Sequence, residues 1–186
     1  MQSERVALIH QQKRSFWEGA LEYINDEWVF FAEEEAFLLE EFYDREVYIY
    51  RGNGWMKGIL IAPNCVCSDH GEYILHGDEW IKIRKSLPYA LEMLIEELSD
   101  EAFFTFIWQL NQLDFSLYDA LYCYNQFVFL GRLPKEGVNF MIFDNGRQIC
   151  SVQYVFTYDQ QLHDRFEFTL NTNQRFIVQG IQPRPS

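Results

Sequence analysis

Residues 86–130 constrain the fold more than any other part of this chain. The segment contains no lysine or arginine, yet seven acids are spread among its many large apolar residues. These acids are Glu92, Glu96, Glu97, Asp100, Glu101, Asp114 and Asp119. Its apolar side chains require burial while its carboxylates require water, and an amphipathic helix meets both needs. We therefore predict a mainly helical segment that forms the acidic side of the protein.

Apolar residues recur at helical spacing in three consecutive parts of this segment. A first stripe runs through residues 91–98, and Ser99 or Asp100 can cap a second helix with a wide apolar face over residues 103–113. Ser116 begins a capping-box-like sequence for a third helix. Residues 127–130 contain little polar character, and we expect them to leave the helix as a strand.

The first 85 residues are rich in short strand-like runs. The predicted strands cover residues 16–24, 28–31, 46–51, 55–61, 72–75 and 79–84. Gly52-Asn53-Gly54 is a hairpin signal, because both residue types tolerate positive φ. His76-Gly77-Asp78 would join a second hairpin, and residues 33–41 would form one or two solvated helical turns. The sequence thus predicts a small, strongly bent sheet or an SH3-like barrel.

Strict alternation marks the C-terminal part from residue 138 onward. Asp144-Asn145-Gly146 is a strong turn signal, and residues 171–174 mark another. We predict a four-stranded antiparallel meander with one apolar face, covered by the helices. Its buried face should contain Phe166, Phe168, Phe176 and Val178, and its exposed face should contain Arg165, Glu167 and Arg175.

These patterns together predict an α+β fold with central helices. We expect a β-rich domain over residues 1–85 and a second domain over residues 86–186 that joins the helices to the C-terminal sheet. The strands of the two parts are expected to form separate sheets.

The formal net charge of −13 limits the classes of partner. Phosphate would be repelled, so direct binding to nucleic acid or to an anionic membrane is disfavoured. No apolar run is long enough to span a bilayer, and the polar start of the chain lacks the apolar core of a signal peptide. We therefore expect a cytoplasmic protein whose four cysteines are thiols.

Cys65, Cys67, His70 and His76 are the best candidates for a metal site, because thiolate and imidazole are the ligands of zinc. The Cys-x-Cys spacing is tighter than that of common zinc knuckles, and His76 falls in a predicted turn. The simpler interpretation is a loop with ordinary thiols and surface histidines, without a cofactor.

Motifs for catalysis are absent from the sequence. It contains no Gly-x-Ser-x-Gly elbow, no Walker-type phosphate loop and no Gly-x-Gly-x-x-Gly. A carboxylate enzyme has no distinguished pair of acids to support it, and a Cys67–His70 pair is a weak candidate for thiol chemistry. The sequence therefore disfavours an enzyme.

Aromatic residues make up 18% of the chain. Trp108, Tyr118 and Tyr122 could form an exposed interaction patch on the helical layer, since Trp and Tyr are favoured interface anchors. The alternative, which we favour, is that they fill a junction between the two sheets.

The whole chain resembles short, acidic, aromatic-rich cytosolic proteins of unknown function from Gram-positive bacteria. Our leading hypothesis is a non-enzymatic module that binds a protein partner, either a basic protein or a second copy of the chain. One alternative is an acidic decoy of a nucleic-acid-binding protein, with residues 33–41 and the helical acids imitating phosphates. The other is a small metal- or thiol-dependent enzyme that uses the loop from Cys65 to His76.

Overall fold

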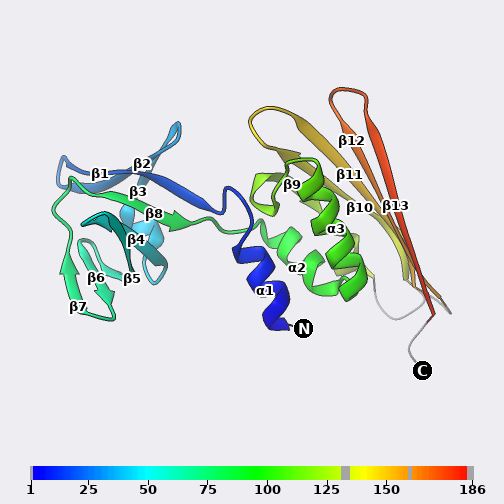
Figure 1. Ribbon diagram of the computed structural model, residues 1–186, viewed down its shortest axis with the longest axis horizontal. Coiled ribbons are helices and arrows are strands. Elements are labelled where there is room, and N and C mark those ends of the chain that lie inside the picture. The colour runs from blue at the N-terminus through cyan, green and yellow to red at the C-terminus, as the bar shows by residue number, and fades with distance from the viewer. Residues whose placement is uncertain (1, 131–134, 159–160, 184–186) are drawn as a thin grey trace. The chain divides into compact units, whose positions relative to one another are not determined.

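The computed structural model describes residues 2–130, 135–158 and 161–183 (Figure 1). The chain divides into two compact units. We call Ser15–Lys85 the N-terminal unit, and we call Met1–Arg14 together with Ser86–Ser186 the C-terminal unit. The first 14 residues thus cluster with the C-terminal part of the chain rather than with the β-rich segment that follows them.

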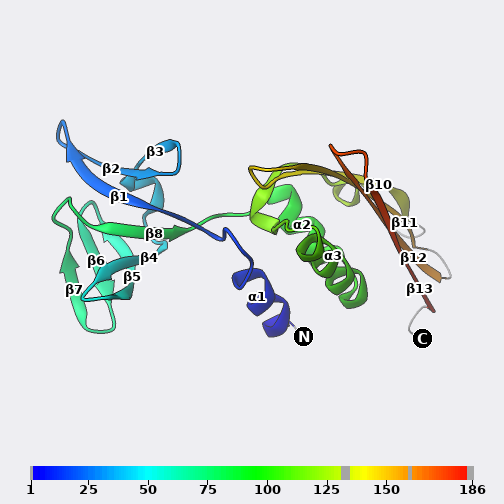
Figure 2. The same cartoon turned by 45° about the horizontal axis from the view of Figure 1, so that its top comes forward.

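The N-terminal unit is one antiparallel sheet of eight strands in the order β3-β2-β1-β8-β4-β5-β6-β7. The strands are β1 (Phe16–Ile24), β2 (Glu27–Ala32), β3 (Glu35–Leu38), β4 (Glu46–Arg51), β5 (Gly54–Ala62), β6 (Cys65–Ser68), β7 (Gly71–Ile74) and β8 (Trp80–Arg84). A 3-10 helix, η1 (Leu39–Phe42), follows β3. Leu21 and Phe30 share one buried cluster with Ile49, Leu60 and Val66, so the sheet bends over its own core (Figure 2). The predicted bent sheet is confirmed.

Two local predictions in this unit meet different outcomes. The hairpin at Gly52-Asn53 is confirmed, because φ is 52° and 69° there and Arg51 pairs with Gly54. The hairpin across His76-Gly77-Asp78 is wrong, because β7 pairs with β6 while β8 lies between β1 and β4. The side chain of Glu79 accepts backbone N–H bonds from residues 76–78, which holds this segment as a connection rather than a hairpin turn. Residues 33–41, predicted to be helical turns, contain the strand β3 and are helical only from Leu39 onward.

The C-terminal unit places helices on one face of a five-stranded antiparallel sheet (Figures 1 and 2). Its helices are α1 (Gln2–His10), α2 (Tyr89–Glu97) and α3 (Asp100–Gln112), with 3-10 turns η2 (Leu117–Asp119) and η3 (Gln126–Phe129). Its strands are β9 (Ala120–Tyr124), β10 (Lys135–Asp144), β11 (Ile149–Tyr158), β12 (Gln161–Leu170) and β13 (Arg175–Pro183), in the order β13-β12-β11-β10-β9. The two separate sheets and the α+β class are confirmed.

The predicted meander is present as β10 to β13, but it is extended by a fifth strand. The predicted third helix is wrong: Ser116 and Asp119 close a single 3-10 turn, after which β9 pairs with β10. The predicted strand at residues 127–130 is also wrong, because most of it is the turn η3. The first two predicted helices are confirmed as α2 and α3, with Ser99 accepting a bond from the Ala102 N–H.

The core of this unit lies between α3 and the sheet. Phe106 is fully buried and stacks on Phe166 at 5.2 Å between ring centroids and on Phe168 at 6.1 Å. Phe176 and Val178 face the same cluster, but they are half-buried where the alternation predicts full burial. Glu167, predicted to be exposed, is buried because Arg165 and Arg175 on either side both pair with its carboxylate.

The acidic side of the central segment is smaller than its sequence suggests. Arg5, Lys13 and Arg14 form ion pairs with Asp100, Asp114 and Asp119, at 2.7, 2.7 and 2.6 Å between charged atoms. Three of the seven carboxylates are therefore neutralised by the first 14 residues, which explains why these residues cluster with the C-terminal unit. None of the helices in the described ranges has the length and apolar character needed to cross a membrane.

Candidate functional site

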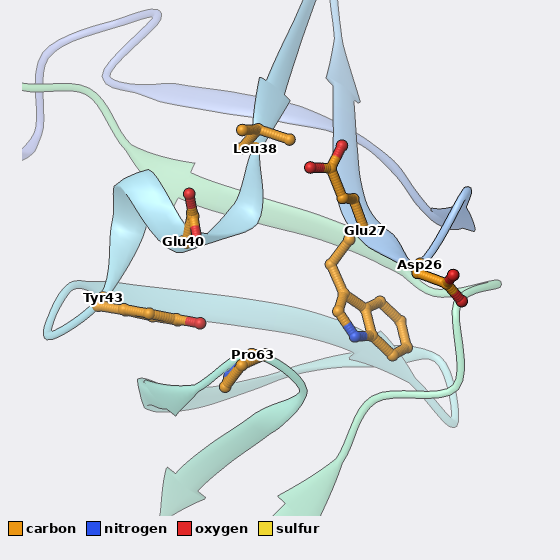
Figure 3. A pocket seen from close by; sticks show the side chains of 7 residues that line it. Asp26, Glu27, Leu38, Glu40, Tyr43 and Pro63 are labelled. Atoms are coloured by element: carbon orange, nitrogen blue, oxygen red, sulfur yellow. The ribbon is translucent and has the colours of Figure 1, made fainter.

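A small pocket of about 170 Å³ opens on the N-terminal unit (Figure 3). It lies where the β1–β2 turn, the end of β3, the η1 turn and the β5–β6 turn converge. Its lining consists of three acids, two aromatic residues and two smaller apolar residues: Asp26, Glu27, Glu40, Trp28, Tyr43, Leu38 and Pro63. Residues far apart in the sequence thus form one acidic and aromatic site.

Local backbone geometry explains why these side chains meet. Asn25 and Asp26 adopt φ of 52° and 67° in a two-residue turn closed by the Ile24–Glu27 pair, and Asn and Asp tolerate this conformation. On the other wall, the Glu41 carboxylate accepts a 3.1 Å bond from the Leu38 N–H. That bond fixes the residue that precedes the η1 turn, and the turn then presents Glu40 and Tyr43 to the pocket.

The charged side chains that line the pocket are all acidic. Asp26, Glu27 and Glu40 are exposed, and within the described parts of the chain none of them forms an ion pair. In Figure 3 the Tyr43 hydroxyl points inward, between Glu40 on one side and Pro63 on the other. Partial burial, and then the negative charge of Glu40, raise the pKa of Tyr43, so its hydroxyl stays protonated.

The chemistry of this lining suits a cation. Of the residues that form the pocket, all of them described, none is a histidine, cysteine, serine or lysine. The groups that the pocket offers to a ligand are therefore its carboxylates and its aromatic rings. Aromatic faces attract ammonium and guanidinium groups, and carboxylates pair with them. A lysine or arginine side chain matches both features.

The cysteines and histidines proposed as metal ligands are dispersed. Cys65 is buried and Cys67 exposed on β6, while His70 and His76 are exposed at the two ends of β7. Burial, followed by the charges of Glu72 and Cys67, raises the pKa of the Cys65 thiol, which makes it a poorer nucleophile. No group of three or more His, Cys, Asp or Glu that could hold a metal ion occurs within the described ranges.

The structure also separates the aromatic residues of the predicted interaction patch. Trp108 is 58% exposed on α3, whereas Tyr122 is 51% exposed on β9. Tyr122 pairs with Ile142, which alternates with the buried core residue Met141, so Tyr122 lies on the sheet face away from the helices. Tyr118 is partly buried. The three residues do not form a common surface.

Sequence patterns did not identify the pocket. Glu40 belongs to the acidic run at residues 33–41, which looks like a solvated face when it is taken alone. Asp26 was recognised only as part of a turn. The signal that could have found the site is the repeated occurrence of acids beside Trp28 and Tyr43, but the long-range sheet pairing that joins them cannot be inferred from local spacing.

Comparison with known proteins gives a family but no activity. The chain is 33% identical over 105 residues to the uncharacterised protein YisN of Bacillus subtilis (strain 168), an alignment that covers 56% of this chain. The match spans about half, 54%, of the length of YisN. No solved structure matches the chain. A family model described as a protein of unknown function (DUF2777) matches residues 3–180, so nearly the whole chain lies within this match and the protein belongs to that family.

Proposed function

We propose that this protein is a non-catalytic protein-interaction module whose acidic and aromatic pocket receives a lysine or arginine side chain of a partner protein. The observation that carries the proposal is the convergence of three carboxylates with Trp28 and Tyr43 in one small cavity. A volume of about 170 Å³ suits a single side chain rather than a larger ligand. The module would thus recognise the charge and the size of one side chain of its partner.

Other features of the chain fit this role. The net charge of −13 would attract a basic partner over a distance and speed its association. All four cysteines are free thiols, in keeping with a cytoplasmic location. The acidic-decoy alternative is less favoured, because Arg5, Lys13 and Arg14 neutralise three of the carboxylates that would have to imitate phosphates.

The direct test is titration with short capped peptides followed by two-dimensional NMR of the amide groups. Gly-Lys-Gly and Gly-Arg-Gly peptides should shift the resonances of Glu27, Glu40 and Tyr43, whereas Gly-Gln-Gly should not. Glu40→Gln should weaken binding by about three- to fivefold, the effect of losing one exposed charge pair. Tyr43→Leu should weaken it similarly by removing the ring face.

Glu92→Gln is the matched control, because Glu92 is also an exposed acid and lies in the C-terminal unit. It removes the same charge and should leave peptide binding unchanged. The proposal fails if the glutamine peptide produces the same shifts as the lysine peptide. It also fails if the shifts of the cationic peptides map to residues outside the pocket.

A further inference from the structure

The outer face of the N-terminal sheet carries an ordered array of aromatic and basic side chains. Along β4 and β8, the inward residues Val47, Ile49, Ile81 and Ile83 are all buried. The residues that alternate with them therefore point away from the core. Together with their neighbours on β1 and β5 they form what we call the aromatic-basic face: Phe16, Glu18, Glu46, Tyr48, Tyr50, Trp55, Lys57, Trp80, Lys82 and Arg84.

The first row across this face is aromatic. Tyr50 pairs with Trp55, and the β4–β8 register that pairs Ile49 with Ile81 places Trp80 beside Tyr50. Trp80 is 48% exposed and Tyr50 is 47% exposed, so both rings present free surface. The Trp80 indole N–H donates a 2.9 Å bond to Glu18, which holds that ring in place. Three rings on neighbouring strands thus form a row that we call the platform, in which Tyr50 and Trp55 meet edge to face at 5.3 Å between ring centroids.

The second row, one alternation further along the strands, is basic. Tyr48 pairs with Lys82 on one side and with Lys57 on the other. The Lys82 ammonium lies 4.2 Å from the ring centroid of Trp55 and 5.2 Å from those of both Tyr48 and Phe16. In the part of the chain that the structure describes, no carboxylate lies within ion-pair distance of this ammonium. Aromatic rings hold it in position, and Glu18, opposite it on β1, accepts a bond from the Trp80 indole instead of pairing with it.

The remaining charges of the face are balanced among themselves. Glu46 pairs with Lys57 at 2.5 Å and approaches Arg84 at 3.7 Å, and it accepts a 2.6 Å bond from the Tyr48 hydroxyl. Arg84 also lies over the Phe16 ring at 4.3 Å. Against the three basic residues stand Glu18 and Glu46, so this face is slightly positive in a strongly acidic chain.

We propose that the aromatic-basic face binds single-stranded nucleic acid, with unpaired bases stacked on Trp80 and Tyr50 and the phosphates running past Lys82. Adjacent strands lie about 4.8 Å apart, so neighbouring rings of the platform are within reach of consecutive nucleotides. Base stacking on aromatic side chains tolerates any sequence, and one cationic row is enough to track a single backbone.

A duplex does not fit the same face, because its bases are already stacked and its phosphates need more cations than the face supplies. The sequence-based expectation against nucleic acid concerned the net charge of the whole chain. Charges more than about 8 Å away are largely screened at physiological ionic strength, so the local face decides this interaction. The face shares no residue with the acidic pocket, and variants can separate the two functions.

The test uses the full chain and a fluorescein-labelled oligothymidylate, followed by fluorescence anisotropy at low salt. Wild-type protein should bind it, and an unlabelled duplex should compete poorly. Trp80→Ala and Tyr50→Ala should each weaken binding at least about fivefold, the lower end of the loss of one stacked base. Lys82→Gln should weaken binding and reduce the slope of log affinity against log salt by about 0.7.

Two control variants carry equivalent changes elsewhere. Trp108→Ala removes a tryptophan of comparable exposure from the C-terminal unit, and Glu40→Gln alters the acidic pocket; neither should weaken binding. Trp80 and Tyr50 are half-exposed, and circular dichroism checks that their variants remain folded. Absence of wild-type binding at low salt overturns the proposal. So does equal competition by the duplex, or unchanged binding by both folded platform variants.

Discussion

The N-terminal unit and the C-terminal unit enclose their cores by different means. In the N-terminal unit the eight-stranded sheet bends over itself, and its core cluster contains residues from strands, their connections and one 3-10 turn. In the C-terminal unit the sheet stays open, and α2 and α3 supply the opposite layer. The bent sheet leaves an aromatic face and a turn-lined pocket outside, whereas the covered sheet buries Phe166 and Phe168 under α3 and exposes Tyr122 on its other face.

The two units also treat a buried carboxylate differently. Glu79 in the N-terminal unit and Asp164 in the C-terminal unit are 7% and 6% exposed. Glu79 accepts bonds from three backbone N–H groups and the Tyr73 hydroxyl. Asp164 accepts bonds from the hydroxyls of Tyr154 and Tyr158. Backbone amides stabilise a carboxylate charge better than two tyrosine hydroxyls do. The pKa of Glu79 is therefore lowered and that of Asp164 is raised, although both side chains are buried.

Removing the Phe106 ring from the helical layer should have the largest effect. It tests whether this layer stabilises only the C-terminal unit. Phe106→Ala should destabilise the C-terminal unit by about 3–5 kcal/mol, because a fully buried ring stacked on the sheet is replaced by a cavity. Far-UV circular dichroism reports this unit, which contains every α-helix among the described residues. Tryptophan fluorescence reports mainly the N-terminal unit, where Trp17, Trp28, Trp55 and Trp80 lie.

The expected result is a helical transition at lower urea and a fluorescence transition that is nearly unchanged. Trp108→Ala is the control on the same helix, and its exposed ring should contribute well under 1 kcal/mol. Equal shifts of both transitions would show that the two units unfold as one.

A smaller effect comes from the two buried carboxylates as pH changes. Burial raises the pKa of Glu79, but the N–H groups of His76 and Gly77 and the Tyr73 hydroxyl more than offset this, so the net pKa is lowered. Its stabilising contribution is therefore present above the ordinary glutamate pKa and is lost as pH falls through the folded-state pKa. Glu79→Gln should cost about 2 kcal/mol at neutral pH, and the cost should shrink in acid.

Asp164 should behave in the opposite way. Burial raises its pKa, the two tyrosine hydroxyls lower it in part, Glu101 raises it further and His163 lowers it slightly. Its contribution is present below the ordinary aspartate pKa and is lost as pH rises through the folded-state pKa. The advantage of wild type over Asp164→Asn should thus grow as pH falls, measured by urea unfolding. Parallel pH profiles for the two variants would contradict the comparison.

How much could be predicted from sequence also differs between the units. In the C-terminal unit each strand alternates around one apolar face, so the burial of Phe166 and Phe168 followed directly from the period of two. Glu167 was missed because its two arginine partners come from its own strand and the next, a detail of register. The strand β9 was missed because its Ala-Leu-Tyr pattern also fits a helix.

In the N-terminal unit the individual strands could be recognised, but their order could not. β8 lies between β1 and β4, and nothing in the local pattern of residues 79–84 distinguishes those partners from β7. The pocket depends on that order, because Asp26, Glu40 and Pro63 meet only after the sheet has folded. The ion pairs of Arg5, Lys13 and Arg14 are equally non-local, which is why the acidic side was overestimated.

The smallest effect concerns Glu92 and Glu96, which form no ion pair with the residues that the structure describes. Glu92 and Glu96 are exposed on α2 four residues apart, a spacing at which like charges repel. Glu96→Lys converts this repulsion into an attractive pair and places a cation in the last turn of the helix, where the helix dipole favours it. At low salt we expect Glu96→Lys to raise the free energy of unfolding by about 0.5–1 kcal/mol, and Glu96→Gln to raise it by roughly half as much. A thermal melt measures both changes.

Added NaCl should stabilise wild type slightly and reduce the difference between wild type and Glu96→Lys, since exposed charges are screened. A reversal that leaves the helical midpoint unchanged at low salt would show that the remaining acids of α2 are already compensated.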